Sequence, residues 1–386
     1  MKEGWEVKKL GEVCEKITDG SHNPPKGIEV SDYFMISSQN IFNDKIIYDD
    51  VRYLSKEDFI KEDKRTNVNQ GDVLLTIVGT VGRCAVFTDD RHLTLQRSVA
   101  VLKPKSDLSS KYLMYSLIGM SESLNKQAHG IAQKGLYLKQ LSQIPIPVPP
   151  LPTQERIVSE LDCINSIIEK KREQLKELDT LAQSIFYDMF GDPIRNEKGW
   201  EVRKLGEVAE SDLGKTLNQS KDTGTLYPYL CAINIQWNTV DLSTLKQTKF
   251  EDSELTRYSV RKGDLLICEG GDIGRSAIWK KDEPMLYQNA LHRVRFGDSI
   301  HPRFCLQYLY ILKINGILDS QYGKGVTIKH LVKSSLLSIP IIVPPLPLQH
   351  EFAAKIEAIE KQKELIKRSI AEVETLLASR MQYYFG

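Results

Sequence analysis

The strongest constraint on this sequence is a long apolar seam that occurs twice. Apolar residues recur at alternating spacings of four and three, the heptad pattern of a helix that packs against one partner helix. The first seam consists of Ile157, Leu161, Ile164, Ile168, Leu175, Leu178, Ala182, Ile185 and Met189, with a polar gap at Lys171. The second consists of Phe352, Ile356, Ile359, Ile366, Ile370, Val373, Leu377 and Tyr384, with gaps at Lys363 and Arg380. Each run of about 36 residues predicts roughly 54 Å of helix, and together they predict a helix pair.

Both predicted helices follow a proline-rich run, at residues 144–152 and 339–347. Proline prevents a helix from continuing and favours an extended chain. Each run is therefore expected to be a stiff connection that leads into its helix.

The seams belong to an internal repeat that covers nearly the whole chain. The opening segment Gly4–Val13 returns as Gly199–Val208, and the proline runs and helix ends recur with the same offset. Between these blocks the offset drifts, so a duplicated frame carries diverged surfaces. Two copies of one frame can be related by a pseudo-two-fold axis. The helices are then expected to pack antiparallel, with globular parts at opposite ends.

The globular parts have a mixed pattern in which strands dominate. Short apolar runs with β-branched residues, bounded by Gly, Asn or Asp, predict strands at 33–36, 72–78, 83–87, 98–102, 264–268, 275–279 and 292–296. Short amphipathic helices are expected at 110–120 and 303–314, whereas 55–65 fits either a loop or an exposed helix. The resulting fold class is α+β, with globular segments 1–152 and 192–347 and long helices 153–191 and 348–386.

Charge, cysteine spacing and hydropathy exclude several classes of protein. Basic and acidic residues number 52 and 51, which argues against coating nucleic acid by charge alone but allows a local basic face. The six cysteines form no CxxC pair, so neither a metal site nor a disulfide framework is expected. Without an apolar signal segment or a membrane-length apolar run, the predicted location is the cytoplasm and no membrane contact is expected.

Two short motifs resemble catalytic sites but lack essential residues. Asn23-Pro24-Pro25 resembles the motif of amino-methyltransferases, yet Lys26 replaces the aromatic ring that stacks on a flipped base, and no GxGxxG fingerprint accompanies it. A turn, or a DNA contact from that turn, is the preferred interpretation. Lys215 follows Gly214 as in a phosphate-binding loop, but the glycine required at position 209 is alanine. No catalytic constellation is predicted.

Polar residues at matching places in the two copies are candidates for DNA contact. Gly-x-x-Gly-Arg turns, at 79–83 and 271–275, can either serve the backbone alone or present an arginine to DNA. Gln, Asn and Arg before strands suit base edges, although ordinary polar strand ends remain the alternative. Lysines beside glycine loops suit phosphates or simply water. The candidates are His22, Ser38, Gln39, Asn40, Thr80, Arg83, Gln96, Arg97, Lys134, Lys215, Asn234, Gln236, Asp272, Arg275, Gln288, Asn289 and Lys324.

The repeated opening segments, the Gly-Asp-apolar blocks, the Gly-x-x-Gly-Arg turns and the proline runs with their long helices make the chain similar to the specificity subunits of type I restriction–modification systems. This resemblance implies two target recognition domains, 1–152 and 192–347, and two spacer helices. It also implies a non-catalytic role in which each domain reads one half of an asymmetric bipartite DNA target. The implied partners are double-stranded DNA, two modification subunits that carry S-adenosylmethionine for adenine N6-methylation, and motor-nuclease restriction subunits, two where they join.

The spacing of the domains favours the same function. About 54 Å corresponds to roughly one and a half turns of B-DNA, so separated domains can read two half-sites with an unread gap. Two alternatives remain: a coiled-coil scaffold that binds only proteins, and a self-sufficient methyltransferase. A two-part DNA footprint would argue against the first, and the missing cofactor loop argues against the second.

Overall fold

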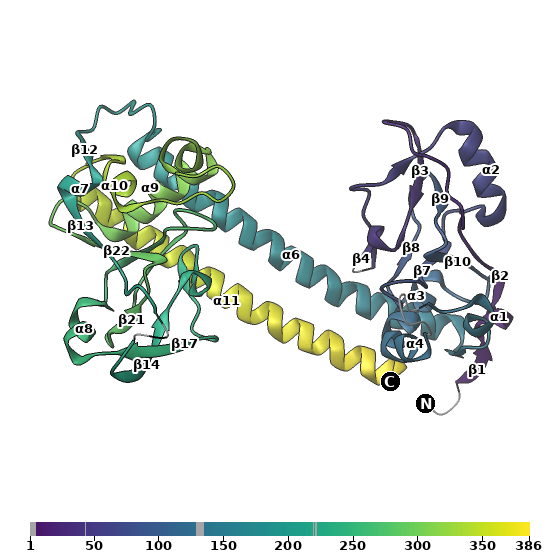
Figure 1. The fold of residues 1–386 in the computed structure, drawn as a ribbon. Helices are drawn as coiled ribbons and strands as arrows, with labels where there is room; N and C mark the ends of the chain where they lie inside the picture. Colours follow the sequence, from purple (N-terminus) through teal and green to yellow (C-terminus); the bar gives the residue numbers. More distant parts are fainter. Residues whose placement is uncertain (1–4, 43, 129–134, 219, 221) are drawn as a thin grey trace. The chain divides into compact units, whose positions relative to one another are not determined.

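The computed structural model describes residues 5–42, 44–128, 135–218, 220 and 222–386. The chain forms two compact units. Unit 1 comprises Met1–Arg172 and Arg368–Gly386, and unit 2 comprises Glu173–Lys367. Two helices of 40 residues, α6 (Leu151–Phe190) and α11 (Leu346–Phe385), contribute residues to both units (Figure 1).

Unit 1 combines short strands with short helices, in agreement with the predicted α+β class. Its strands are β1 (Glu6–Lys9), β2 (Cys14–Asp19), β3 (Tyr33–Ile36), β4 (Ile41–Phe42), β5 (Lys45–Ile46), β6 (Arg52–Tyr53), β7 (Val73–Thr76), β8 (Cys84–Val86), β9 (His92–Leu95), β10 (Val99–Pro104) and β11 (Pro145–Val148). Its helices, besides parts of α6 and α11, are α1 (Leu10–Val13), the 3₁₀ turn η1 (Ser38–Asn40), α2 (Lys56–Thr66), α3 (Ser110–Gly119), α4 (Ser121–Gln127) and α5 (Leu138–Leu141).

Unit 2 repeats this order of elements. Its strands are β12 (Val202–Lys204), β13 (Ala209–Leu213), β14 (Thr225–Leu230), β15 (Ile235–Gln236), β16 (Thr239–Val240), β17 (Lys246–Phe250), β18 (Ser259–Val260), β19 (Leu265–Cys268), β20 (Ser276–Ile278), β21 (Met285–Tyr287), β22 (Leu291–Phe296) and β23 (Pro340–Ile342). Its own helices are α7 (Leu205–Val208), the 3₁₀ turn η2 (Ala232–Asn234), α8 (Asp252–Arg257), α9 (Pro302–Ile314), the π-helical turn η3 (Leu318–Tyr322) and α10 (Lys333–Leu337).

The sheets confirm the internal repeat at the level of topology. The sheet β2-β10-β7-β8 of unit 1 has the same strand order as β13-β22-β19-β20 of unit 2. A second sheet is built around a parallel pair in each unit, β3 with β9 and β14 with β21. In unit 1, α2 covers β9 and β3 (Figure 1). The segment 55–65, for which the sequence allowed two interpretations, forms α2 from Lys56 onward, with Ser55 as the N-cap.

Most of each proline-rich run is extended, as predicted, and this part is also paired. The last two residues of the runs, Leu151-Pro152 and Leu346-Pro347, already belong to the long helices, since proline is tolerated in the first turn of a helix. β11 pairs antiparallel with β1, and β23 pairs antiparallel with β12. Each pair is a two-stranded sheet, so proline lies on an edge strand where a missing backbone donor is tolerated. The opening segment of each repeat is thereby joined to the run that leads into the long helix.

Both heptad seams pack as predicted. In unit 1, Ile157 and Leu161 near the start of α6 share a core with Tyr384 near the end of α11. In unit 2, Phe186 near the end of α6 shares a core with Phe352 near the start of α11. Within each unit the two helices therefore meet start to end, which is the antiparallel arrangement of a coiled coil.

Two polar gaps in the second seam are filled by ion pairs between the helices. In unit 2, the Lys363 Nζ lies 2.7 Å from Asp179 Oδ1. In unit 1, Arg380 pairs with Glu160, whose Oε2 also accepts a hydrogen bond of 2.6 Å from the Tyr384 hydroxyl. These partners let charged side chains lie at the seam without an unpaired buried charge.

Candidate nucleic-acid interface

In unit 1 the predicted reading residues meet at the carboxyl end of a parallel strand pair. β3 and β9 run parallel with Ile36 opposite Leu95, so the residues that follow both strands leave the sheet at one edge. β3 is followed by Ser37 and the turn η1, and β9 is followed by Gln96, Arg97 and Ser98. The Ser38 amide donates to Ser98 Oγ at 3.0 Å and joins the two segments.

The turn after β3 is held by one buried amide. The Asn40 Oδ1 accepts from the Ser37 amide at 2.9 Å, and its Nδ2 donates to the carbonyls of Ile47 and Asp49, each at 3.1 Å. The Asn40 side chain is thus occupied by the backbone. Its neighbour Gln39 is exposed, with its side chain available to a ligand.

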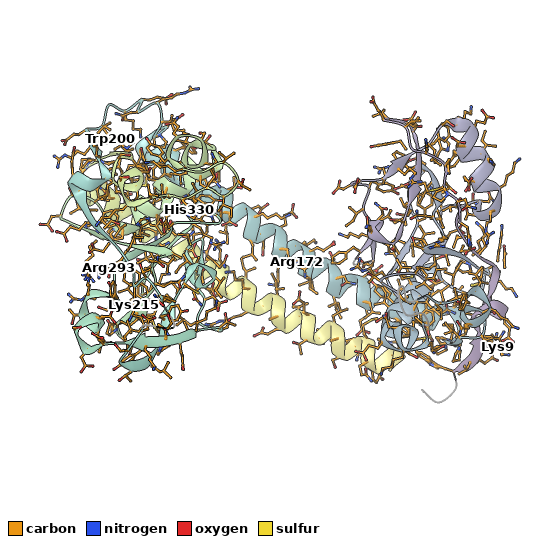
Figure 2. The ribbon with its side chains drawn as sticks, in the orientation of Figure 1. Lys9, Arg172, Trp200, Lys215, Arg293 and His330 are labelled. Carbon is orange, nitrogen blue, oxygen red and sulfur yellow. The ribbon has the colours of Figure 1, made fainter. Side chains whose placement is uncertain are left out.

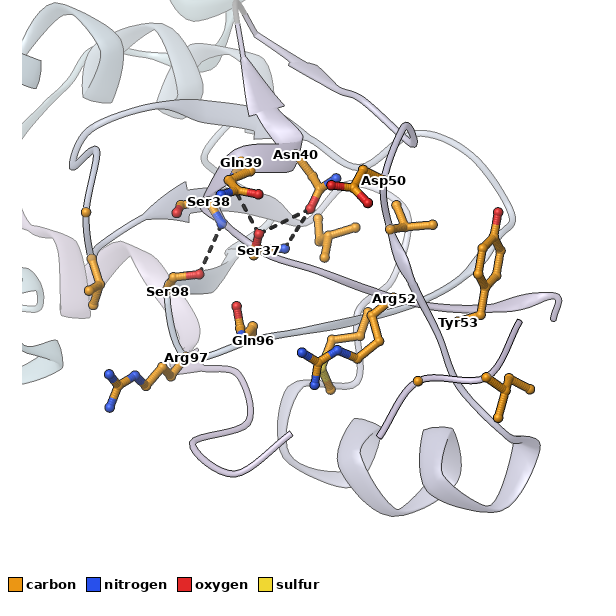
Figure 3. A pocket seen from close by; sticks show the side chains of 17 residues that line it. Ser37, Ser38, Gln39, Asn40, Asp50, Arg52, Tyr53, Gln96, Arg97 and Ser98 are labelled. Carbon is orange, nitrogen blue, oxygen red and sulfur yellow. Dashed lines mark hydrogen bonds between the residues drawn. The ribbon is translucent and has the colours of Figure 1, made fainter. Parts of the chain in front are cut away.

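These segments border an open cavity of about 730 Å³. Figure 3 shows Ser37 to Asn40 along one side, with Gln96 and Arg97 across from them and Arg52 at a third side. Amide, hydroxyl and guanidinium groups therefore converge on one space. Gln and Arg are the side chains that read adenine and guanine edges with paired hydrogen bonds.

Unit 2 places its counterparts in the same way. β14 and β21 run parallel with Leu230 opposite Tyr287, and they lead into η2 and into Gln288 and Asn289. The buried Asn234 repeats the Asn40 network, since its Oδ1 accepts from the Cys231 amide and its Nδ2 donates to the Asp241 and Thr244 carbonyls. The frame is conserved between the units, whereas the side chains that it presents differ.

The Gly-x-x-Gly-Arg turns need their glycines for backbone reasons. Gly79 and Gly82 have φ values of 83° and 96°, and Gly271 and Gly274 have 75° and 80°, all in the left-handed region that favours glycine. The two arginines differ in their surroundings. The Arg83 guanidinium lies 4.8 Å from the centre of the Phe42 ring, whereas Arg275 Nη2 donates to the Ala232 carbonyl at 2.9 Å.

Several other predicted residues are engaged within the protein. Lys215 is buried, and its ammonium lies 2.6 Å from Glu254 and 3.5 Å from Asp222. Asp272 pairs with Lys313 at 2.8 Å. The structure therefore gives Lys215, labelled in Figure 2, and Asp272 contacts within the unit, as it does Asn40 and Asn234.

The remaining predicted residues lie at the surface in other places. His22 Nε2 lies 2.8 Å from Asp19 Oδ2, and Gln236 Nε2 donates to the Ile233 carbonyl at 3.2 Å. Thr80 and Lys324 are exposed. Lys134 lies outside the described residues.

The sequence did not single out Arg52, Asp50 or Tyr53, which also line the cavity of unit 1. Arg52 reaches this place because β6 pairs antiparallel with β3, with Arg52 opposite Met35. Two-residue strands such as β6 leave too short a pattern for a sequence signal. Their counterpart in unit 2 is β17, which pairs antiparallel with β14 and places Lys246 opposite Tyr229.

Among the described residues, no cluster of three or more His, Cys, Asp or Glu side chains is placed to hold a metal ion. The helices formed by those residues include none with the length and apolar character needed to cross a membrane.

Comparisons with known proteins agree with the repeat. The family model for the type I restriction modification DNA specificity domain matches twice, at residues 2–178 and 197–375. The MjaVIII specificity subunit of a type I restriction enzyme from Methanocaldococcus jannaschii is 22% identical over 405 residues, covering 97% of this chain and 92% of that protein.

Solved structures share the fold. A chain from a study of complex assembly and conformational transition in a type I restriction–modification system superposes with a TM-score of 0.62 at 19% identity, covering 100% of this chain and 98% of that chain. The S subunit of a type I system from M. genitalium gives a TM-score of 0.56 at 14% identity, with coverages of 98% and 95%.

Proposed function

Because this chain belongs to the type I restriction modification DNA specificity family, we propose that its units read the two halves of one bipartite, asymmetric DNA target. The cavity beside β3 and β9 is the reading site of unit 1. The corresponding ends of β14 and β21 form the reading site of unit 2.

One observation carries this proposal: the same frame is present twice and offers different side chains. Gln39 and Arg97 of unit 1 correspond to Ile233 and Asn289 of unit 2 at the ends of equivalent strands. Because hydrogen-bond donors and acceptors specify bases, different side chains on one frame select different half-sites. The target is therefore asymmetric.

The chain itself acts without catalysis in this proposal. Two modification subunits bring S-adenosylmethionine and methylate adenine N6, and restriction subunits join them where the system also cleaves DNA. The sequence supports this division, because it lacks a GxGxxG fingerprint and the aromatic ring expected after Asn23-Pro24-Pro25. The long helices set the distance between half-sites and provide the surface on which the modification subunits dock. The complex works in the cytoplasm.

The test is to co-express the chain with its modification subunit and to map N6-methyladenine by single-molecule sequencing. We expect one motif with two dissimilar specified halves and an unspecified gap. A single contiguous motif would contradict the assignment of one half-site to each unit. Binding of the modification subunit without any sequence-dependent methylation would instead favour a scaffold that contacts only proteins.

Substitutions in the unit 1 cavity sharpen this test. We expect Arg97→Ala or Gln39→Ala to relax the motif at one half only, by about 5- to 100-fold in discrimination for a lost bidentate contact. Arg91→Ala is the matched control. Arg91 is another exposed arginine of unit 1, and its guanidinium lies 3.9 Å from the centre of the Tyr48 ring, away from the cavity.

A further inference from the structure

A second open cavity, of about 510 Å³, lies in unit 2 and is lined mainly by cations. Its basic residues are Arg257, Arg261, Arg293, Arg295 and Lys333, and Asp212 is the one acid among the described residues that line it. Asp264 lies beside this group and pairs with Arg295. Five basic groups and these two carboxylates leave a formal charge of +3.

Two of the five cations are fully engaged within the protein. Arg293 is buried, and its guanidinium donates to Asp212 Oδ2 at 2.8 Å and to the carbonyls of Ser259 and Arg257 at 2.8 and 3.1 Å. Arg295 forms two hydrogen bonds to the carboxylate of Asp264, at 2.7 and 2.9 Å. These arginines shape the wall of the cavity.

Two of the other three cations, Arg257 and Arg261, are available to a ligand. Arg257 and Arg261 are exposed, and neither guanidinium has a hydrogen bond or an ion pair to the residues that the structure describes. Lys333 shares Asp212 with Arg293, at 3.3 Å. Burial alone would raise the pKa of Asp212, but Lys333 and Arg293 lower it, so this carboxylate is already neutralised by neighbours. The Arg257 guanidinium lies 5.2 Å from the centre of the Tyr258 ring, a contact that leaves its N–H donors free. Two guanidinium groups without a carboxylate partner at one cavity suit an anion.

Unit 1 has no such cluster at the equivalent positions. The counterpart of Arg293 in unit 1 is Val101. Both residues lie on the middle strand of three, opposite matching positions of the strands on either side. Asn69 takes the place of Arg261, because the amide of each donates to the matching aspartate. Arg65, at the end of α2 as Arg257 is at the end of α8, pairs with Asp19. The cavity is therefore a property of the unit 2 surface rather than of the repeated frame.

The cavity also adjoins the candidate reading site of unit 2. Gly214 and Thr216 line it. The residue between them, Lys215, is hydrogen-bonded through its backbone to the end of β21 and the residues that follow it. The Lys215 amide donates to the Tyr287 carbonyl at 3.1 Å, and the Lys215 carbonyl accepts from the Asn289 amide at 3.0 Å. One short segment thus separates the basic cavity from the strand end that carries Gln288 and Asn289. A group bound in the cavity lies beside the residues proposed to read bases.

We propose that this cavity binds a phosphate group through Arg257 and Arg261, with Lys333 as a third cation. This proposal rests on the proposed DNA-reading function, because the first source of the phosphate group is the phosphodiester backbone of the DNA beside the unit 2 half-site. The same chemistry would accept the phosphate monoester of a free nucleotide. Because unit 1 lacks the cluster, the salt-dependent part of DNA binding is expected to be larger for unit 2.

The first experiment uses the full chain without substitution. An arginine-selective dicarbonyl reagent is applied at low salt, and the modified arginines are counted by mass spectrometry, with no ligand, with a 20-base-pair duplex of arbitrary sequence, or with adenosine monophosphate. We expect Arg257 and Arg261 to be protected at least about threefold by the duplex. Arg195, an exposed arginine of unit 2 outside the cavity, is the internal control and is expected to react equally in all samples.

The second experiment measures how the association constant for the same duplex depends on salt. We expect the double variant Arg257→Gln/Arg261→Gln to lower the log–log slope by about 1 to 2, as for one or two lost phosphate contacts. The double variant Arg195→Gln/Lys262→Gln removes the same charge outside the cavity and is expected to leave the slope unchanged. Both pairs consist of surface residues, and circular dichroism checks the fold.

The results of the two experiments distinguish a DNA backbone phosphate from a free nucleotide, and both of these from a cavity that binds no phosphate. Protection by the duplex together with a lower slope supports a backbone phosphate, whereas protection by adenosine monophosphate alone supports a free nucleotide. If neither ligand protects Arg257 and Arg261, and the slope is the same in both double variants, the proposal is wrong. The half-site assignment would survive that result, because it is tested independently by the methylation motif.

Discussion

At the residue scale, two buried glutamines show how each long helix is tied to its unit. Gln154 of α6 accepts from the Ser109 amide at 2.8 Å and donates to the carbonyls of Asp107 and Pro149 at 3.0 and 2.9 Å. Gln349 of α11 makes the equivalent bonds to His301, Ser299 and Pro344. One amide thus joins the helix, the proline-rich run before it and the loop before α3 or α9.

Replacing Gln154 by methionine should destabilise unit 1 by about 3 kcal/mol, because the substitution leaves buried backbone donors and acceptors without partners. The measurement is urea unfolding of the full chain. Gln362→Met, on the exposed face of α11, is the control and should change the free energy of unfolding by less than about 0.5 kcal/mol. Equal effects of the two substitutions would contradict the role of Gln154.

The ion pair at the seam of unit 1 predicts a dependence of stability on pH. Hydrogen bonds from Arg380 and then Tyr384 lower the pKa of Glu160 below its usual value of 4.5. A carboxyl with a lowered folded-state pKa stabilises the fold above its unfolded pKa and loses that contribution as pH falls through the folded value. The Tm of the wild-type chain should therefore exceed that of Glu160→Gln at pH 7, and the difference should shrink as the pH falls below 4.5. A difference that stays constant over this range would contradict the assignment, and Glu155→Gln is the exposed control.

The sequence pattern predicted which polar residues could contact DNA, but it could not separate exposed side chains from those with a structural role. Asn40 and Gln39 are adjacent and similar in chemistry, yet one is buried in a turn and the other is exposed. The difference depends on carbonyls seven and nine residues away that fold back onto Asn40. Such contacts follow from the path of the chain, which no local pattern encodes.

At the element scale, the patterns with long periods were the most informative. The heptad seams predicted the two long helices, because each seam repeats over many turns, and the internal repeat predicted their antiparallel packing. The proline-rich runs were predicted to be extended, but their pairing with the opening strands was not, since the partners lie more than 130 residues apart. The parallel pairing of β3 with β9 was missed for the same reason, although it places the candidate site.

The seam makes a prediction that two neighbouring isoleucines can test. Ile168 lies at a seam position and is 4% exposed, whereas Ile167 beside it is 40% exposed. Ile168→Ala should lower the free energy of unfolding by about 2 to 4 kcal/mol through lost burial and a cavity, and Ile167→Ala by less than about 1 kcal/mol. Urea unfolding of both variants measures the difference. Similar losses would show that α6 packs through another face.

At the scale of the whole molecule, duplication separates what must be shared from what must differ. Both units use the same sheet order, the same glutamine tie and the same asparagine turn. The exposed side chains differ, since Gln39 and Arg97 of unit 1 correspond to Ile233 and Asn289 of unit 2. Selection for an unlike pair of half-sites would produce this division, because the frame fixes position and the exposed side chains fix sequence.

The proposed spacer role makes the final prediction. One heptad inserted into α6 after Arg172, and another into α11 after Lys367, lies at the boundary of the units and preserves the phase of both seams. Seven residues add about 10.5 Å of helix, or roughly 3 base pairs of B-DNA. Methylation mapping should therefore show both half-sites unchanged and the gap between them about 3 base pairs longer. Insertions of two residues rotate the seam by more than half a turn and should abolish methylation, since apolar residues then face water. If the paired heptads leave the gap unchanged, or alter a half-site, the helices do not set the distance between the reading sites.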